Sequence, residues 1–121
     1  AIPSCIYSYP EVAKVGLTER EATKQGYEIK VGKFPFQANG KAHVYGETNG
    51  FVKIVADTQT EDILGVHMIG PTVTEMISEA NLAKMLDASV WEVSQTIHPH
   101  PTVSESFFEA ALAVDGKQIH S

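Results

Sequence analysis

The order of two hydrophobic periodicities along the chain is the strongest constraint on its fold. Apolar and polar residues alternate in most segments up to residue 69, as they do in strands, and the spacing typical of helices dominates afterwards. The nearly continuous apolar run at 63–69 predicts a central strand that is covered on both faces. Strands followed by helices are typical of α+β domains, so we expect an antiparallel β-sheet with helices packed on one face.

Turn residues and capping sequences divide this pattern into separate elements. Thr18-Glu19-Arg20-Glu21 fits a capping box, which predicts a short helix that ends at Gly26. Apolar residues at helical spacing, with Met76 and Leu86 among them, predict a long helix in the second half of the chain. We expect strands at 12–17, 27–36, 42–45, 51–56 and 63–69, a short apolar run at 5–7, and further helices at 73–86, 90–95 and 103–114.

Length and charge limit the classes of function. The 121 residues predict a single domain spanning 1–121, and the formal net charge of −6 argues against nucleic-acid binding, which requires clustered lysine and arginine. No apolar run is long enough to span a bilayer. Cys5 is the only cysteine, so no intrachain disulfide or redox dithiol is possible. The acidic charge is compatible with a basic protein partner.

Residues able to carry out chemistry are concentrated in the segment Ile97-His98-Pro99-His100-Pro101-Thr102-Val103-Ser104-Glu105, where the imidazole of His100 precedes a carboxylate by five positions. Proline disfavours helical backbone in the residue before it, so His100 should be extended, with a helix beginning near Val103. Such a segment can hold the His100 ring against Glu105, and imidazole exchanges protons near neutral pH. In a functional interpretation, His100 and Glu105 form a catalytic acid–base pair in which Glu105 orients the ring.

The same residues also fit a purely structural interpretation. Thr102-Val103-Ser104-Glu105 is a capping-box sequence, in which Glu105 would merely accept a hydrogen bond from the Thr102 amide. Because a carboxylate has two oxygens, Glu105 can cap the helix and accept the His100 N–H at the same time. The sequence leaves both interpretations open.

The other histidine of this segment does not complete a metal site. His98 and His100 alternate on an extended backbone, so they should point in opposite directions and form a poor chelating pair. We expect no metal, and we interpret His98 as a packed or hydrogen-bonded support for the loop. Trp91 and the pair Phe107-Phe108 are expected to anchor helices.

The sequence His-Pro-His-Pro-Thr-Val-Ser-Glu at residues 98–105 resembles the C-terminal active-site signature of the dihydrolipoamide dehydrogenases, which belong to the flavin disulfide reductases. Further segments resemble landmarks of that family's dimerisation (interface) domain, in the same order along the chain. These segments lie at residues 2–3, 9–19, 34–42, 50–53, 63–70, 75–77 and 116–120. The doubled His-Pro resembles the lipoamide enzymes more than the glutathione-type enzymes, and Pro99 stands where the family commonly has a small residue such as alanine.

The resemblance implies roles for particular residues. His100 matches the catalytic base, and Glu105 matches the carboxylate that orients it. The backbone of His100 and Pro101 is similar to the part that approaches the FAD of the partner subunit, and the bond between these residues is often cis in the family. The resemblance also implies a separate or excised dimerisation domain, because the FAD- and NAD-binding domains and paired redox cysteines have no counterpart in residues 1–121.

For the whole enzyme, the resemblance implies NAD-linked oxidation of a protein-bound dihydrolipoyl group through a disulfide and FAD. It implies a cytoplasmic or mitochondrial-matrix homodimer that binds the subunit-binding domain of the acyltransferase (E2) of 2-oxoacid dehydrogenase complexes. The isolated domain is expected to be inactive and to bind no cofactor, with Phe107, Phe108, Ala111, Leu112 and the strand before Gly70 as candidates for its two-fold interface. The alternatives are a glutathione-reductase-like enzyme and a stand-alone, non-catalytic dimerisation module.

Overall fold

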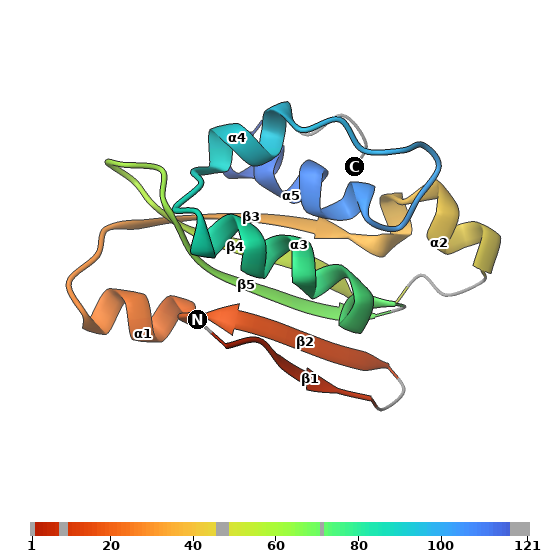
Figure 1. Cartoon of the computed structure of the whole chain (residues 1–121), viewed down its shortest axis with the longest axis horizontal. Coiled ribbons are helices and arrows are strands. Elements are labelled where there is room, and N and C mark those ends of the chain that lie inside the picture. The colour runs from red at the N-terminus through yellow and green to blue at the C-terminus, as the bar shows by residue number, and fades with distance from the viewer. Residues whose placement is uncertain (1, 8–9, 46–48, 71, 117–121) are drawn as a thin grey trace.

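The computed structural model of the protein describes residues 2–7, 10–45, 49–70 and 72–116. The landmark expected at 116–120 lies outside the described residues, except for Gly116. The elements are β1 (Ser4–Ile6), β2 (Glu11–Gly16), α1 (Glu19–Lys24), β3 (Ile29–Pro35), η1 (Phe36–Ala38), α2 (Gly40–Tyr45), β4 (Phe51–Asp57), β5 (Ile63–Gly70), α3 (Val73–Met85), α4 (Val90–Gln95) and α5 (Glu105–Val114). Figure 1 labels the strands and the α-helices.

The five strands form one antiparallel sheet in the order β1-β2-β5-β4-β3. The hairpin of β4 and β5 forms as predicted, with one register irregularity between Val55 and Ala56. β5 lies between β2 and β4, and most of its residues are buried. The continuous apolar run at 63–69 therefore marks the central strand, as the sequence predicts.

Helices α3 and α5 pack against one face of this sheet, α3 over β2 and β5 and α5 over β3 and β4 (Figure 1). The opposite face is covered in part by α1, whose Ala22 packs with Val55 and Leu64. Val55 alternates with the core residues Ile54 and Ala56, which places this smaller cluster on the other side of the pleated strand. The predicted α+β class is confirmed, with α1 as the exception to helices on one face. Within the described ranges, no helix combines the length and apolar character needed to cross a membrane.

The contact between α5 and β3 fixes where α5 starts relative to the sheet. A Cβ atom added to Gly32 of β3 would collide with the Ala110 carbonyl oxygen and come within 2.5 Å of the Val114 nitrogen. Phe107, Ala110 and Ala111 of α5 are buried in the main core. Because α5 packs this closely on β3, the position of its first residue, Glu105, relative to the sheet is fixed.

The predicted strand at 42–45 is wrong, because Gly40–Tyr45 form the helix α2. Asn39 precedes this helix, and its side-chain Oδ1 accepts the Ala42 amide hydrogen over 2.8 Å, in the manner of an N-cap. The Asn39 carbonyl accepts the amide hydrogen of His43, one turn into the helix. This local contact favours a helix at 40–45, and the hydrophobic periodicity of the sequence gives no indication of it.

Several predictions for single side chains need correction. Leu86 lies just beyond α3 and is 72% exposed, so it does not belong to the packed face of that helix. Trp91 is 60% exposed and does not anchor α4. Phe107 does anchor α5, but Phe107 and Ala111 are each 1% exposed, so they belong to the core and not to an interface surface. The strand before Gly70, which was another candidate for the interface, is the central strand β5, and most of its residues are buried.

Candidate active site

The loop at 96–104 joins α4 to α5 and carries the two neighbouring histidines. Helix α4 ends at Gln95, and the next residue, Thr96, has extended backbone (φ −73°, ψ 128°). Pro99 and Pro101 each lack an amide hydrogen and restrict the residue before them, which keeps this stretch out of the helical region. The His100-Pro101 peptide bond is cis.

Glu105 occupies the first position of α5 and closes the loop. Its Oε1 accepts the Thr102 amide hydrogen over 2.8 Å, and its own amide hydrogen is donated to Thr102 Oγ1 over 3.3 Å. These reciprocal bonds form the capping box that the sequence allows. The regular helix α5 begins at Glu105, two residues later than predicted, and Val103 and Ser104 form the turn between Thr102 and Glu105.

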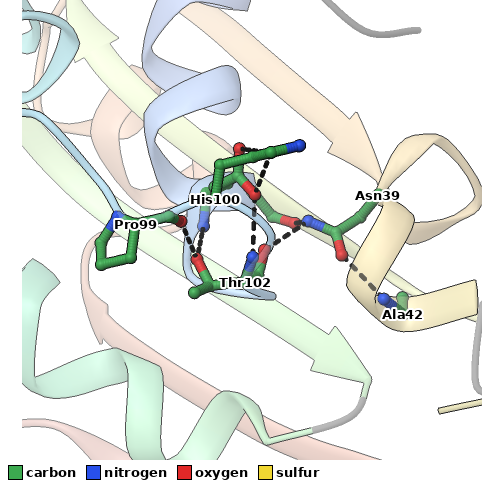
Figure 2. Close-up of polar contacts among 7 residues, drawn as sticks. Asn39, Ala42, Pro99, His100 and Thr102 are labelled. Carbon is green, nitrogen blue, oxygen red and sulfur yellow. Dashed lines mark hydrogen bonds and ion pairs between the residues drawn. The ribbon is translucent and has the colours of Figure 1, made fainter. Parts of the chain in front are cut away.

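The same carboxylate contacts the His100 ring. Nδ1 of His100 lies 3.0 Å from Oε1 and 2.9 Å from Oε2 of Glu105. The His100 side chain is 69% exposed, whereas that of Glu105 is 15% exposed. Capping and ring contact thus occur together, and Figure 2 shows the dashed contacts that converge around His100 and Thr102.

This contact selects the protonation pattern of the ring. An ionised carboxylate only accepts hydrogen bonds, so Nδ1 of His100 is assigned the hydrogen and donates it to Glu105. In the neutral imidazole, Nε2 is then the atom that can accept a proton. The pair can therefore act as a base whose positive charge, once formed, is stabilised by the carboxylate.

His98 points the other way and supports the loop from inside. Its Nε2 lies 2.6 Å from Glu79 Oε2 on α3, and its Nδ1 lies 3.0 Å from the Thr96 carbonyl oxygen. The ring also packs on Phe108, with 5.7 Å between centroids. The hydrogen bond to Glu79 raises the pKa of His98 above its usual value. His98 is thus the packed, hydrogen-bonded support that the sequence predicts.

A hollow of about 220 Å³ lies beside the His100 ring. Five of its lining residues were not singled out from the sequence as site residues, and two of these, Asn39 and Glu109, have polar side chains. Glu109 is 2% exposed and follows Glu105 by one helical turn. Its spacing of four residues from Glu105 places both on the same face of the helix, and this spacing could have identified it as a site residue. Asn39 is 4% exposed and lies in a segment whose composition indicates only a turn.

The described residues do not bring together a metal-binding set. Among them, no group of three or more His, Cys, Asp or Glu side chains is placed to hold a metal ion. The structure thus brings together His100 and Glu105, whereas the ring nitrogens of His98 contact Glu79 and the Thr96 carbonyl oxygen. Cys5 is half-buried on the edge strand β1.

Comparison with known proteins identifies the domain. Residues 2–111 match the family described as pyridine nucleotide-disulphide oxidoreductase, dimerisation domain. The chain belongs to this family. Over 119 residues it is 71% identical to a dihydrolipoyl dehydrogenase of Bacillus subtilis and 50% identical to one of Zymomonas mobilis, and each match covers 98% of this chain. The domain spans only 25% and 26%, respectively, of those relatives, which are oxidoreductases.

Solved structures of two longer chains contain the same fold. The domain superposes on LpdA from Mycobacterium tuberculosis with a TM-score of 0.85 at 26% identity, covering 91% of this chain and 24% of that one. It superposes on the Cu(II) complex of the HOCl-induced flavoprotein disulfide reductase RclA from Escherichia coli with a TM-score of 0.87 at 27% identity, covering 91% and 25%. These matches confirm the family and the α+β dimerisation-domain fold expected from the sequence.

Proposed function

We propose that this domain is the C-terminal interface domain of a dihydrolipoamide dehydrogenase and that it supplies His100 and Glu105 to the redox site of a partner subunit. The observation that carries the proposal is the double contact of Glu105 with the exposed His100 ring, at 2.9 and 3.0 Å. A histidine that is held by a carboxylate and has most of its side chain exposed is suited to exchange protons with a substrate from outside the domain. The names of the relatives support the lipoyl substrate.

The proposed reaction oxidises a dihydrolipoyl dithiol to a disulfide. A thiol must lose its proton before it attacks, because the thiolate is the nucleophile in disulfide exchange. Nε2 of His100 takes this proton, and Glu105 stabilises the resulting imidazolium through Nδ1–H. The thiolate attacks the partner's redox disulfide, so one S–S bond forms while another breaks. The second substrate thiol gives its proton to the thiolate released in the first step and attacks the substrate sulfur of the mixed disulfide, which releases oxidised lipoamide. The proton held by His100 passes to the sulfur released last, so the partner's dithiol is left reduced.

FAD and NAD are assigned to other parts of the complete enzyme. FAD bound there would supply the acceptor for the electron pair of the reduced dithiol, and NAD⁺ would supply the final hydride acceptor. The described residues fit a domain that approaches a cofactor without enclosing it. The hollow beside His100 holds about 220 Å³, whereas pockets for drug-sized ligands begin at roughly 300 Å³. His100 and Pro101 are therefore proposed to face the partner's FAD from outside its binding pocket.

Replacing His100 in the complete enzyme tests this assignment. His100→Gln should lower turnover of dihydrolipoamide by about 10²–10⁴-fold, the usual contribution of an acid–base group, while FAD stays bound. Reduction of ferricyanide by NADH should persist, because that reaction involves no thiol deprotonation. His67→Gln is the matched control, since His67 lies on β5, away from the His100 loop, and its Nε2 contacts the Leu17 carbonyl oxygen. Near-normal turnover of the His100 variant would refute the proposal.

The proposal includes self-association and a protein partner. A domain of this family is expected to join two subunits of a homodimer, and sedimentation equilibrium that finds only monomer at high concentration would contradict this. The net charge of −6 favours a partner with a basic surface. The E2 subunit-binding domain is therefore expected to contact this domain through basic residues. Such binding should weaken as salt concentration rises, because exposed charges are screened.

A further inference from the structure

Asn39 is a buried amide that bridges two segments far apart in the sequence. It lies between η1 and α2 and is 4% exposed. Its Nδ2 donates to the Thr102 carbonyl oxygen over 2.9 Å and to Ser106 Oγ over 3.1 Å. Its Oδ1 accepts the Ala42 amide hydrogen over 2.8 Å. Both ends of the side-chain amide are therefore used, one toward α2 and the other toward the start of α5.

The partners fix which end of the amide is which. The Thr102 carbonyl oxygen can only accept a hydrogen bond, and the Ala42 amide can only donate one. The reverse placement would set the Asn39 oxygen against one carbonyl oxygen and its NH₂ group against an N–H. An aspartate at this position could not donate to the Thr102 carbonyl when ionised, so the structure requires an amide here.

The contacts of Asn39 lead directly to the acid–base pair. Asn39 holds the carbonyl side of Thr102, while the amide of Thr102 donates to Glu105 Oε1 over 2.8 Å. Glu105 in turn accepts the Nδ1 hydrogen of His100. Thr102 Oγ1 also donates to the Pro99 carbonyl over 2.7 Å, which closes the loop around His100. Figure 2 shows this path of dashed contacts from Ala42 through Asn39 and Thr102 to His100.

Asn39 also borders the space in which a substrate would meet the ring. It lines the hollow of about 220 Å³ together with His100 and Glu105. From the geometry we infer that Asn39 is a positioning residue for the proposed reaction: it holds the Thr102 peptide so that Glu105 and His100 keep their mutual orientation. This inference rests on the proposed function of His100. Asn39 itself contacts neither the ring nor Glu105 in the hydrogen bonds described above.

Variants of Asn39 in the complete enzyme test this role. Asn39→Asp keeps the shape and the acceptor for Ala42 but loses both donated bonds, and Asn39→Ala loses all three. Each should lower kcat for dihydrolipoamide by about 10- to 100-fold, since small misplacements of reacting groups have effects of this size. KM and ferricyanide reduction by NADH should stay at wild-type values. Ser106→Ala, which removes only one acceptor, should have a smaller effect.

A matched control separates positioning from general destabilisation. Thr18→Ala removes the hydrogen bond from the Glu21 amide to Thr18 Oγ1 at α1, away from the His100 loop. It should lower the melting temperature and leave dihydrolipoamide turnover unchanged. If Asn39→Asp does not fold, Asn39→Ala decides the question, because it buries no new charge. Loss of ferricyanide reduction in proportion to dihydrolipoamide turnover would show a general structural role and overturn the inference.

A double-variant comparison gives the decisive readout. If Asn39 acts through His100, then adding Asn39→Ala to His100→Gln should lower turnover no further. Multiplicative losses would show that Asn39 acts independently of His100 and would overturn the inference. If His100→Gln alone retains normal turnover, the proposed function fails. If His100→Gln abolishes turnover while both Asn39 variants match wild type, only the role of Asn39 fails.

Discussion

The imidazole of His98 is bonded to Glu79 of α3, with 2.6 Å between Nε2 and Oε2. The His98 side chain is 6% exposed, whereas that of His100, two positions further on, is 69% exposed. Phe108 of α5 packs against the same inner ring. One histidine thus ties the loop to two helices, and the next projects away from the domain. The doubled His-Pro sequence accordingly combines an anchor with a candidate base.

Stability should depend on pH through the His98–Glu79 pair. The hydrogen bond to Glu79 is the largest cause that raises the pKa of His98 above 6.5, although burial acts in the opposite direction. Because the folded-state pKa exceeds the unfolded one, the stabilisation is full below about pH 6.5 and is lost as pH rises through the folded pKa. Glu79→Gln should therefore lower the free energy of unfolding by about 1 kcal/mol at pH 6, and by less at pH 9, in chemical denaturation.

A neighbouring glutamate provides the control for this pH dependence. Glu75 is exposed and lies one turn before Glu79 on α3. Glu75→Gln should change the free energy of unfolding by similar small amounts at pH 6 and pH 9. An effect of Glu79→Gln that is equally large at both pH values would mean that the charge on His98 contributes nothing.

Gly32 should tolerate no side chain, because β3 and α5 touch there. Gly32→Ala would place a Cβ against the Ala110 carbonyl and within 2.5 Å of the Val114 nitrogen, so the helix must move. We expect the free energy of unfolding to fall by about 1–3 kcal/mol. Gly40→Ala is the matched control, since nothing lies within 4 Å of its added Cβ. Equal melting temperatures for the two variants would contradict this close contact.

The elements that sequence predicts well are those decided by long apolar patterns. Residues 63–69 are apolar on both faces, and they form the central strand because only that position buries both faces. The helix at 40–45 was missed because its start depends on the side chain of Asn39, a contact within a few residues that composition cannot reveal. Leu86 fits a helical spacing, but α3 ends at Met85 and leaves it exposed.

In the candidate site, too, local contacts can be predicted from the sequence, whereas the long-range contact of Asn39 cannot. His100 and Glu105 lie close in the sequence and are joined by prolines and a capping box, so local rules suffice to predict their contact. Asn39 is bonded to Thr102, which lies 63 positions further along the chain. The two residues come together only because β3 pairs with its neighbouring strand and α5 packs on β3. Without such a tertiary arrangement, Asn39 reads as an ordinary turn residue.

Glu105 both caps α5 and orients His100, and two substitutions can separate these roles. Glu105→Gln retains an oxygen for the Thr102 amide but loses the negative charge, whereas Glu105→Ala loses the cap as well. The free energy of unfolding should stay close to wild type for Gln and fall by about 1 kcal/mol for Ala. Turnover of dihydrolipoamide by the complete enzyme should fall by about 10- to 100-fold in both, since a hydrogen bond to a charged group contributes about 1.5–3 kcal/mol. If turnover instead follows stability, so that Glu105→Gln is fully active, then Glu105 serves α5 as a cap alone, and His100 works without its charge.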